Sequence, residues 1–465
     1  MHLQRIQVPD FRALKNVDIS FEKEFTPRIF PLGSQNGGGK STLLQLIFVL
    51  LHCSGNPDRV EFIQNLLSGF QVNHESGKRT LAIIDIWDGS KTITLEFFVS
   101  NESYIVNLLK EDGEDDEIKL IRHHKLIRYY NFHEERFLSE KISPLEDEID
   151  KLDKLLQPVL KDKLNNQDNV LGISSQSEGE LIFKQIGKIH SKINDEMKVC
   201  KEYKQFLIDL LENKHLFYIC NFNPCNNSTI EKLICKIDGI DIKEANVFCN
   251  KLSNKIFLTA HVSQIFLFLK PANRKSLFKT QKNNQFNYYQ QIKTANSKLP
   301  GFFTYDFLSI DILLKSFKKA RDDDFQEAVK QRGNYGNNYV KLLDELNNLL
   351  SNKKINVEPD LSGVNFKIDG DETELYPEDL SHGELKRLCI YMWLKHNKIE
   401  DAIVLMDELE ISFHPDWQYQ IVRDLEEWGA TNQYILATHS YELCNAVTPA
   451  HVKELDPKLQ ARTIQ

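Results

Sequence analysis

The sequence has no apolar run long enough to cross a membrane. A transmembrane helix needs about 20 consecutive apolar residues, and the longest largely apolar run here, 43–51, is far shorter. The N-terminus also lacks the pattern of a secretory signal peptide. We therefore expect a cytoplasmic protein with no membrane partner.

The eight cysteines lack the paired CxxC spacing of a zinc site. In a protein expected in the cytoplasm they are thiols rather than disulfides. Packed thiols are favoured over a bound metal, although the sequence leaves both open for the five that fall in one region. These five are Cys200, Cys220, Cys225, Cys235 and Cys249.

The chain has no excess of positive charge, because its net charge is −9. This argues against nucleic-acid binding over the whole surface. One region differs, since no acidic residue occurs between Glu244 and Asp306. Its stretch 251–298 interleaves lysines and arginines with aromatic residues, which suits phosphate contacts and base stacking. Docking of an acidic protein surface and a merely solvated face remain open alternatives.

A glycine-rich segment, 33–42, lies between an expected strand at 28–32 and an expected buried helix at 43–51. Such a turn directs backbone N–H groups at phosphate oxygens. Lys40 would reach the β- and γ-phosphates of ATP, and the Ser41 hydroxyl would bind Mg²⁺. Ser34 stands where the first glycine is expected, which requires a negative φ there. The predicted ATP-binding residues of this loop are Asn36, Gly37, Gly38, Gly39, Lys40, Ser41 and Thr42.

A continuous apolar run at 402–406 ends in Asp407 and Glu408. Such a run is typical of a strand buried on both faces of a parallel sheet. At the tip of the strand, Asp407 would hold Mg²⁺ and Glu408 would orient and deprotonate the attacking water. A strand followed by a plain acidic turn is the alternative.

A second expected strand, 433–437, leads into Thr438 and His439. His439 would hydrogen-bond the γ-phosphate. The spacing from Glu408 leaves room for one helix, so the two strands form a strand–helix–strand unit. Neighbouring parallel strands then bring both tips to one edge of the sheet.

Ser381 and Glu384 precede a segment with helical apolar spacing. They read as an N-cap and its capping-box partner. The same helix start, with Gly383, can also point its positive end at a phosphate. Capping alone would explain the Ser and the Glu, so both interpretations stay open.

Together these motifs resemble the ABC-type ATPase superfamily in its SMC-like and OLD-like branch. The opening residues 3–6 and 10–14 and the segment 407–415 look like that branch too. The resemblance implies that Arg12 approaches the nucleotide, and that Ser381, Gly383 and Glu384 act on ATP held by a second copy of the chain. It therefore implies a homodimer, possibly a higher oligomer, with ATP and Mg²⁺ as cofactors. The glutamine loop of the family has no assigned position.

The layout of the whole chain looks most like the ATPase subunits of Septu anti-phage systems. Segments 320–325, 335–337 and 342–347 carry this resemblance. It implies that ATP-dependent dimerisation controls a separate HNH-family nuclease, since the roughly 25 residues after His439 are too few for a nuclease domain. A stand-alone SMC-like ATPase that repairs or clamps DNA, and a nucleotide-sensing scaffold with little turnover, are the alternatives.

The expected fold is an α/β ABC-type ATPase head. Its N-terminal lobe would span 1–135 and its C-terminal lobe 355–465. A mainly helical insertion, 136–354, would split the two. Because heptads are not sustained in the insertion, we expect a compact helical arm rather than a long coiled coil.

Overall fold

The computed structural model describes residues 1–35, 37–72, 77–111, 145–152, 154, 173–224, 230–261, 264, 268, 294, 297–305, 310–330, 333, 335–370 and 373–455. Asn36, Cys225 and most of the basic stretch 251–298, including Arg274 and Lys279, lie outside these residues. The chain forms two compact units. The first comprises 1–68, 80–97 and 236–465, and the second comprises 69–79 and 98–235.

The first unit is built on a parallel sheet with the strand order β15-β3-β14-β13-β8-β9. The five pairings between neighbouring strands of this order are all parallel. Every residue of β13 and β14 is buried, which explains their unbroken apolar sequences. The bounds are β3 Ile29–Gly33, β8 Ile256–Ala260, β9 Phe302–Thr304, β13 Ile403–Asp407, β14 Gln433–Thr438 and β15 Lys453–Glu454.

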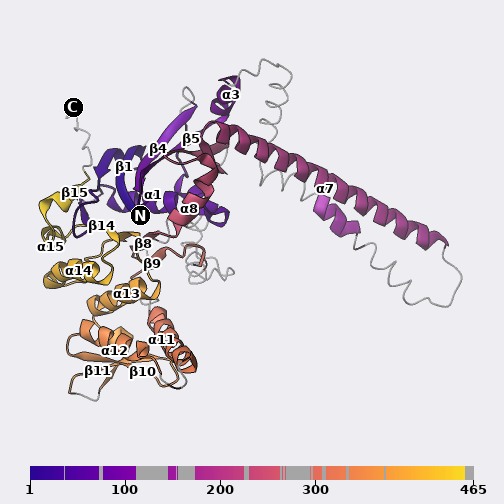
Figure 1. Ribbon diagram of the computed structural model, residues 1–465. Helices are drawn as coiled ribbons and strands as arrows, with labels where there is room; N and C mark the ends of the chain where they lie inside the picture. Colours follow the sequence, from indigo (N-terminus) through magenta and orange to yellow (C-terminus); the bar gives the residue numbers. More distant parts are fainter. Residues whose placement is uncertain are drawn as a thin grey trace, which may run out of the picture. The chain divides into compact units, whose positions relative to one another are not determined.

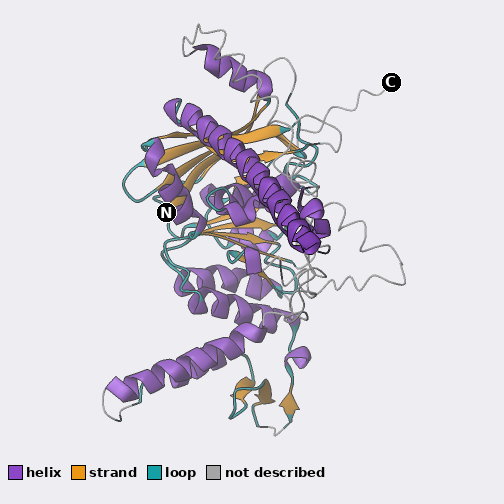
Figure 2. Cartoon of the chain, turned by 90° about the vertical axis from the view of Figure 1, so that its right-hand side faces the viewer, coloured by secondary structure: helices purple, strands orange, loops and turns teal. Residues whose placement is uncertain are grey.

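Helices cover both faces of this sheet (Figure 2). Alternate residues of β13 and β14 share one core with α13 (His382–His396) and α14 (Pro415–Trp428). Helix α1 (Lys40–Cys53) also contacts β8, β13 and β14, yet none of its described residues joins that core. Since successive strand residues face opposite ways, α1 lies on the other face. The α/β class expected from the sequence is confirmed.

Two antiparallel groups complete the first unit. Strands β2 (Leu14–Ser20), β1 (His2–Phe11), β4 (Lys78–Trp87) and β5 (Thr92–Ser100) lie in that order. A small sheet of β10 (Lys353–Val357), β11 (Val364–Ile368) and β12 (Glu374–Leu375) lies beside the helix pair α11 (Ile310–Lys330) and α12 (Asn338–Leu349), as Figure 1 shows. Shorter helices are α2 (Val60–Leu66), α8 (Ala245–Ser253) and α15 (Tyr441–Asn445).

The second unit pairs β6 (Leu216–Phe222) and β7 (Glu231–Asp238) with α3 (Glu102–Glu111) and α7 (Ile173–Asn213). Its core gathers apolar residues of α3, the C-terminal end of α7, β6 and β7. Helix α7 is a single helix of 41 residues, about 60 Å long. An unbroken helix of this length contradicts the expected compact arm.

The middle of the chain is helical, as expected, but it also contains strands that the sequence did not reveal. Strands β6 to β9 all fall within 136–354, and β10 begins at its end. Of these, β8 and β9 belong to the same parallel sheet as the phosphate-loop strand β3. Within the described part of the chain, no helix is both long enough and apolar enough to cross a membrane.

Candidate functional site

The phosphate loop follows β3 and opens α1, as the sequence predicts. Gly37 and Gly39 have φ values of 80° and 89°, which side chains with a Cβ rarely adopt. Ser34 is not among the residues with positive φ, so it can replace the expected glycine. A Cβ on Gly38 would clash with the Oγ and Cβ atoms of Ser34, so the Ser34 side chain leaves room only for glycine there.

The Lys40 ammonium lies inside the loop, where its side chain is largely buried. It donates to the backbone oxygen and to the hydroxyl of Ser34, each at 3.1 Å. The His439 Nε2 atom lies 3.0 Å away. Burial lowers the pKa of Lys40, against the opposing attraction of Asp407. The structure thus brings together a cation from the loop and the histidine at the end of β14.

Asp407 meets the first turn of α1. The Ser41 hydroxyl donates to the Asp407 Oδ1 atom at 3.0 Å. Burial raises the pKa of Asp407 to about 6, while hydrogen bonds from Ser41 and Gln264 oppose that rise. The parallel register explains why Asp407 lies next to Ser41, because Asp407 pairs with Ala437 and Thr438 pairs with Gly33. All these strand ends therefore lie along one edge.

Gln264, which follows β8, also reaches this edge. Its Nε2 atom donates to the second carboxylate oxygen of Asp407. Its Oε1 atom accepts from the Gln45 Nε2 atom of α1 at 2.5 Å. Sequence reasoning did not find Gln264, because β8 itself was not recognised as a strand of this sheet. A strand at 256–260 next to β13 is the signal that would have placed it.

A hydroxyl, a carboxylate and an amide here form a set of oxygen donors. Mg²⁺ prefers oxygen ligands and keeps several for water and phosphate, so few protein ligands suffice. Among the described residues no cluster of three or more His, Cys, Asp or Glu side chains could hold a metal on its own. Ser41 and Asp407 fit Mg²⁺ bound together with a nucleotide, and the Gln264 side-chain oxygen would fit after a turn of its amide.

The turn after β13 positions Glu408. This residue has a φ of 49°, and its backbone N–H donates to the Ala437 oxygen at 2.9 Å. The side chain is partly exposed, unlike that of Asp407. Nearby, the Glu410 Oε1 atom accepts from the His439 backbone N–H at 2.6 Å. Glu410 thereby fixes the backbone of His439, a contact that the sequence did not predict.

Arg12 occupies a turn next to the loop. A Cβ on Gly39 would lie 2.7 Å from the Leu14 side chain, so the turn that Arg12 begins lies against the loop. The guanidinium itself donates to the Leu66 backbone oxygen at 2.8 Å. Its approach to a nucleotide stays a prediction.

Ser381, Gly383 and Glu384 form a separate group at the start of α13. The predicted capping box is confirmed, since Ser381 Oγ accepts from the Glu384 N–H and the Glu384 carboxylate accepts from the Ser381 N–H. Gly383 lies where an added Cβ would meet the Ser412 oxygen at 2.7 Å. The helix start is thus packed tightly against the turn that follows Glu408. In the described part of the chain, the side chains of Ser381 and Glu384 share no hydrogen bond with the phosphate loop.

Lys386 joins the same helix to the same turn. Its buried ammonium donates to the backbone oxygens of Glu408 and Ile411, at 3.1 and 3.2 Å. It also lies 4.1 Å from the centre of the Tyr305 ring. Burial lowers the pKa of Lys386 to about 7, although Glu410 and Glu408 act in the opposite direction. This lysine was also missed from the sequence, where it looks like any helical lysine.

The cysteines of the middle region have no shared site among the described residues. Cys220, Cys235 and Cys249 are buried free thiols. Burial raises the pKa of Cys220 and of Cys249 to about 12, so both stay protonated at neutral pH.

Comparison with known proteins shows that the chain belongs to the AAA ATPase domain family. The family described as AAA ATPase domain matches residues 1–444. The "Retron Vc95 probable ATPase" of Vibrio cholerae serotype O1 biovar El Tor is 27% identical over 202 residues, covering 37% of this chain and 39% of that protein. The "Retron Ec83 probable ATPase" of Escherichia coli is 35% identical over 51 residues, 11% of this chain and 9% of that protein. The chain therefore spans well under half the length of these curated relatives.

Solved structures align along most of the chain, but with low TM-scores. A Pyrococcus furiosus Smc head domain, with an extended coiled coil and bound to the C-terminal domain of ScpA, covers 96% of this chain and 92% of its own. Its TM-score is 0.32 at 10% identity. The recombination mediator protein RecF covers 95% and 93%, with a TM-score of 0.26 at 10% identity.

The buried Lys386 should make the stability of the protein depend on pH. Its folded pKa of about 7 lies below its ordinary value of 10.5, so the unfolded chain keeps a proton that the folded chain releases. The free energy of unfolding should therefore rise between pH 7 and pH 10, and Lys386→Met should remove that part of the rise. Urea unfolding followed by tryptophan fluorescence at pH 7, 8 and 9 measures it. Lys354→Met, at an exposed position, is the control, and parallel curves for wild type and Lys386→Met would contradict the assignment.

Proposed function

We propose, from the premise that this chain belongs to the AAA ATPase domain family, that it hydrolyses Mg²⁺-bound ATP in a site completed by a second copy of the chain. Membership of the family supports ATPase activity. One observation supports the finer proposal: the loop lysine, the Ser41 hydroxyl, the Asp407 carboxylate and the His439 ring converge at one edge of a parallel sheet.

Each residue has a role that its position allows. Backbone N–H groups of Gly37 to Thr42 face the phosphates at the start of α1. Lys40 offsets charge on the β- and γ-phosphates, and His439 donates to the γ-phosphate. Ser41 and Asp407 hold Mg²⁺, which when bound neutralises the charge that develops on the phosphate oxygens.

Glu408 is the proposed general base. It follows the metal-binding carboxylate directly, and its positive φ turns its side chain out of the strand direction. Its partial exposure leaves room for a water molecule beside the γ-phosphate. The hydrogen bonds from Glu408 to the Ala437 oxygen and from Lys386 to the Glu408 oxygen hold the turn from two sides, so the carboxylate is preorganised.

Ser381 and Gly383 are proposed to act in trans. The start of α13 carries the positive end of the helix dipole. Within its own chain this helix start packs against the turn after Glu408. A second copy would bring it to the γ-phosphate, which makes ATP the bridge between two heads.

We further propose that the ATP-bound dimer controls a separate effector in anti-phage defence, and that this effector is an HNH-family nuclease as in Septu. The names of the retron ATPase relatives support the general role. The sequence resemblance of segments 320–325, 335–337 and 342–347 to the Septu subunits supports the particular one. Docking of a nuclease or a nucleic acid on the basic stretch 251–298 is part of the proposal, and most of that stretch lies outside the described residues.

Lys40→Ala should abolish ATP binding, because no other charge in the loop replaces the ammonium at the β- and γ-phosphates. Fluorescence anisotropy of a labelled ATP analogue measures the affinity. Lys354→Ala removes the same charge at an exposed position and should bind like wild type. Equal affinity in wild type and Lys40→Ala would rule out the phosphate-loop assignment.

Glu408→Gln should keep ATP binding but slow hydrolysis by about 10²- to 10⁴-fold, the usual effect of a positioned base. It should also accumulate the ATP-bound dimer. Single-turnover phosphate release measures the rate, and Glu426→Gln on the exposed face of α14 is the control. Negligible turnover by wild type itself would favour a nucleotide sensor instead.

Complementation between two inactive variants tests the shared site. Ser381→Arg places bulk and charge where the second head must meet the γ-phosphate, so ATP still binds one head but the heads do not close. A mixture of Ser381→Arg and Lys40→Ala proteins should recover at most about a quarter of wild-type activity. Random pairing makes half of the dimers mixed, and each mixed dimer has one working site of its two. Full activity of Ser381→Arg alone would mean that the heads do not share their sites.

A further inference from the structure

The carboxylate of Glu384 creates an electrostatic problem for the proposed trans site. It is buried within the first turn of α13, and its Oε2 atom accepts from both the Ser381 N–H at 3.0 Å and the Ser381 hydroxyl at 2.8 Å. A carboxylate there stabilises the helix start. The same negative charge would repel the γ-phosphate that Ser381 is proposed to meet.

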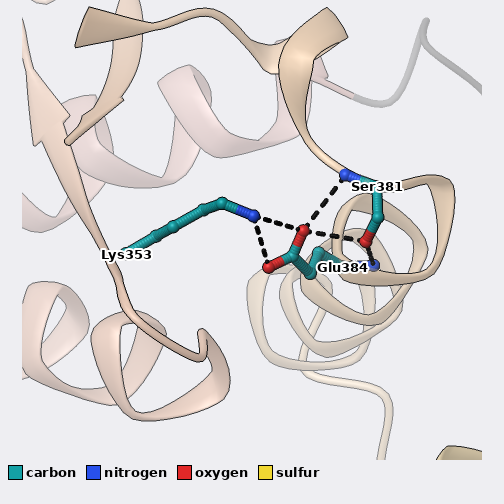
Figure 3. A network of polar contacts seen from close by, with 3 residues as sticks. All are labelled: Lys353, Ser381 and Glu384. Atoms are coloured by element: carbon teal, nitrogen blue, oxygen red, sulfur yellow. Dashed lines mark hydrogen bonds and ion pairs between the residues drawn. The ribbon is translucent and has the colours of Figure 1, made fainter. Parts of the chain in front are cut away.

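A lysine from a different element meets this carboxylate. Lys353, the first residue of β10, donates to the Oε1 and Oε2 atoms of Glu384, both at 2.8 Å. Figure 3 shows its side chain reaching across to the carboxylate from the side opposite Ser381. The pair is well shielded, since the side chains are only 22% and 7% exposed. A shielded pair is screened little by salt, so its charge balance is felt by an approaching anion.

The pair is fixed by packing on both sides. Strand β10 begins right after α12, and the Asn347 Oδ1 atom of α12 accepts from the Ile355 N–H at 2.7 Å. Ile355 of β10 belongs to the same core as Leu388 and Tyr391 of α13. Lys353 is therefore held at the helix start by the small sheet rather than by a flexible loop.

The pKa of Glu384 reflects this arrangement. Burial acts to raise it, but hydrogen bonds from Lys353 and Ser381 and the Lys353 charge together hold the pKa below its ordinary value. The carboxylate is thus ionised at neutral pH, and neutralisation has to come from Lys353.

Resting on the proposed shared ATP site, we infer that Lys353 is a positioning residue of that site: it cancels the Glu384 charge so that the Ser381 turn can receive the γ-phosphate of the ATP held by the second copy. Glu384 fixes the backbone at the start of α13, and Lys353 removes the negative charge that would otherwise repel an anion there. The net charge of Lys353 and Glu384 together then determines the dissociation constant of the ATP-bound dimer.

The test is ATP-dependent dimerisation in the Glu408→Gln background, measured by analytical ultracentrifugation at pH 8. With the pair intact the local charge is zero. Lys353→Met leaves it at −1, Glu384→Gln makes it +1, and the double variant restores zero. We expect Lys353→Met to raise the dimer dissociation constant about tenfold or more. The double variant should return to the parent value, and Glu384→Gln should be at least as tight as the parent.

Two further variants separate this role from a structural one. Lys353→Arg should also dimerise like the parent. Lys354→Met is the matched control, since it removes the same charge from the next residue, which faces the opposite way on β10 and is 69% exposed.

The outcomes are distinct. Single-head ATP affinity, measured by anisotropy, shows whether Lys353→Met still folds and binds. Parent-like dimerisation of Lys353→Met, or a double variant as weak as Lys353→Met, would overturn the inference while leaving the shared site intact. A parent protein that does not dimerise with ATP would overturn the shared site and this inference together.

Discussion

The parallel alignment of β3, β14, β13 and β8 is the constraint on which the rest of the site depends. Parallel strands end at the same edge of their sheet, so residues more than 350 positions apart become neighbours. Ser41 reaches Asp407, and Lys40 reaches His439, only because these strand ends are in register. The burial of β13 and β14 on both faces fixes that register, since any slip would expose apolar side chains or bury polar ones.

Two buried charges of opposite sign lie along this edge, and neither fully neutralises the other. Asp407 is a buried carboxylate whose pKa is raised to about 6, and Lys40 is a buried ammonium whose pKa is lowered. Each is costly to keep ionised without a ligand. In the proposed complex, Mg²⁺ would meet the carboxylate and the phosphates would meet the ammonium, so both charges would be offset when the nucleotide binds.

The start of α13 differs from this edge, because the negative charge of Glu384 is already neutralised by Lys353. Glu384 has both a cation and two donors, and Lys386 holds the opposite side of the same helix to the turn of Glu408. One helix thus contacts the backbone of Glu408, the proposed general base, through Lys386, and carries the exposed Ser381 at its start. In the proposed dimer, this connection between the two turns would let each head sense its partner.

The sequence by itself determined the motifs whose chemistry is local. Glycines at positive φ, a lysine and a hydroxyl at the start of a helix, a capping box and an apolar strand ending in acids all follow from neighbouring residues, and the structure contains each of them. Only the tertiary structure decided which distant residues join them. Gln264, Glu410, Lys386 and Lys353 carry no local signal, because a glutamine after an unrecognised strand or a lysine on a helix looks ordinary until folding desolvates it beside a charge. Likewise, β8 and β9 joined the sheet by pairing with strands that lie far away in the sequence, whereas only the C-terminal end of the 41-residue α7 packs into a core.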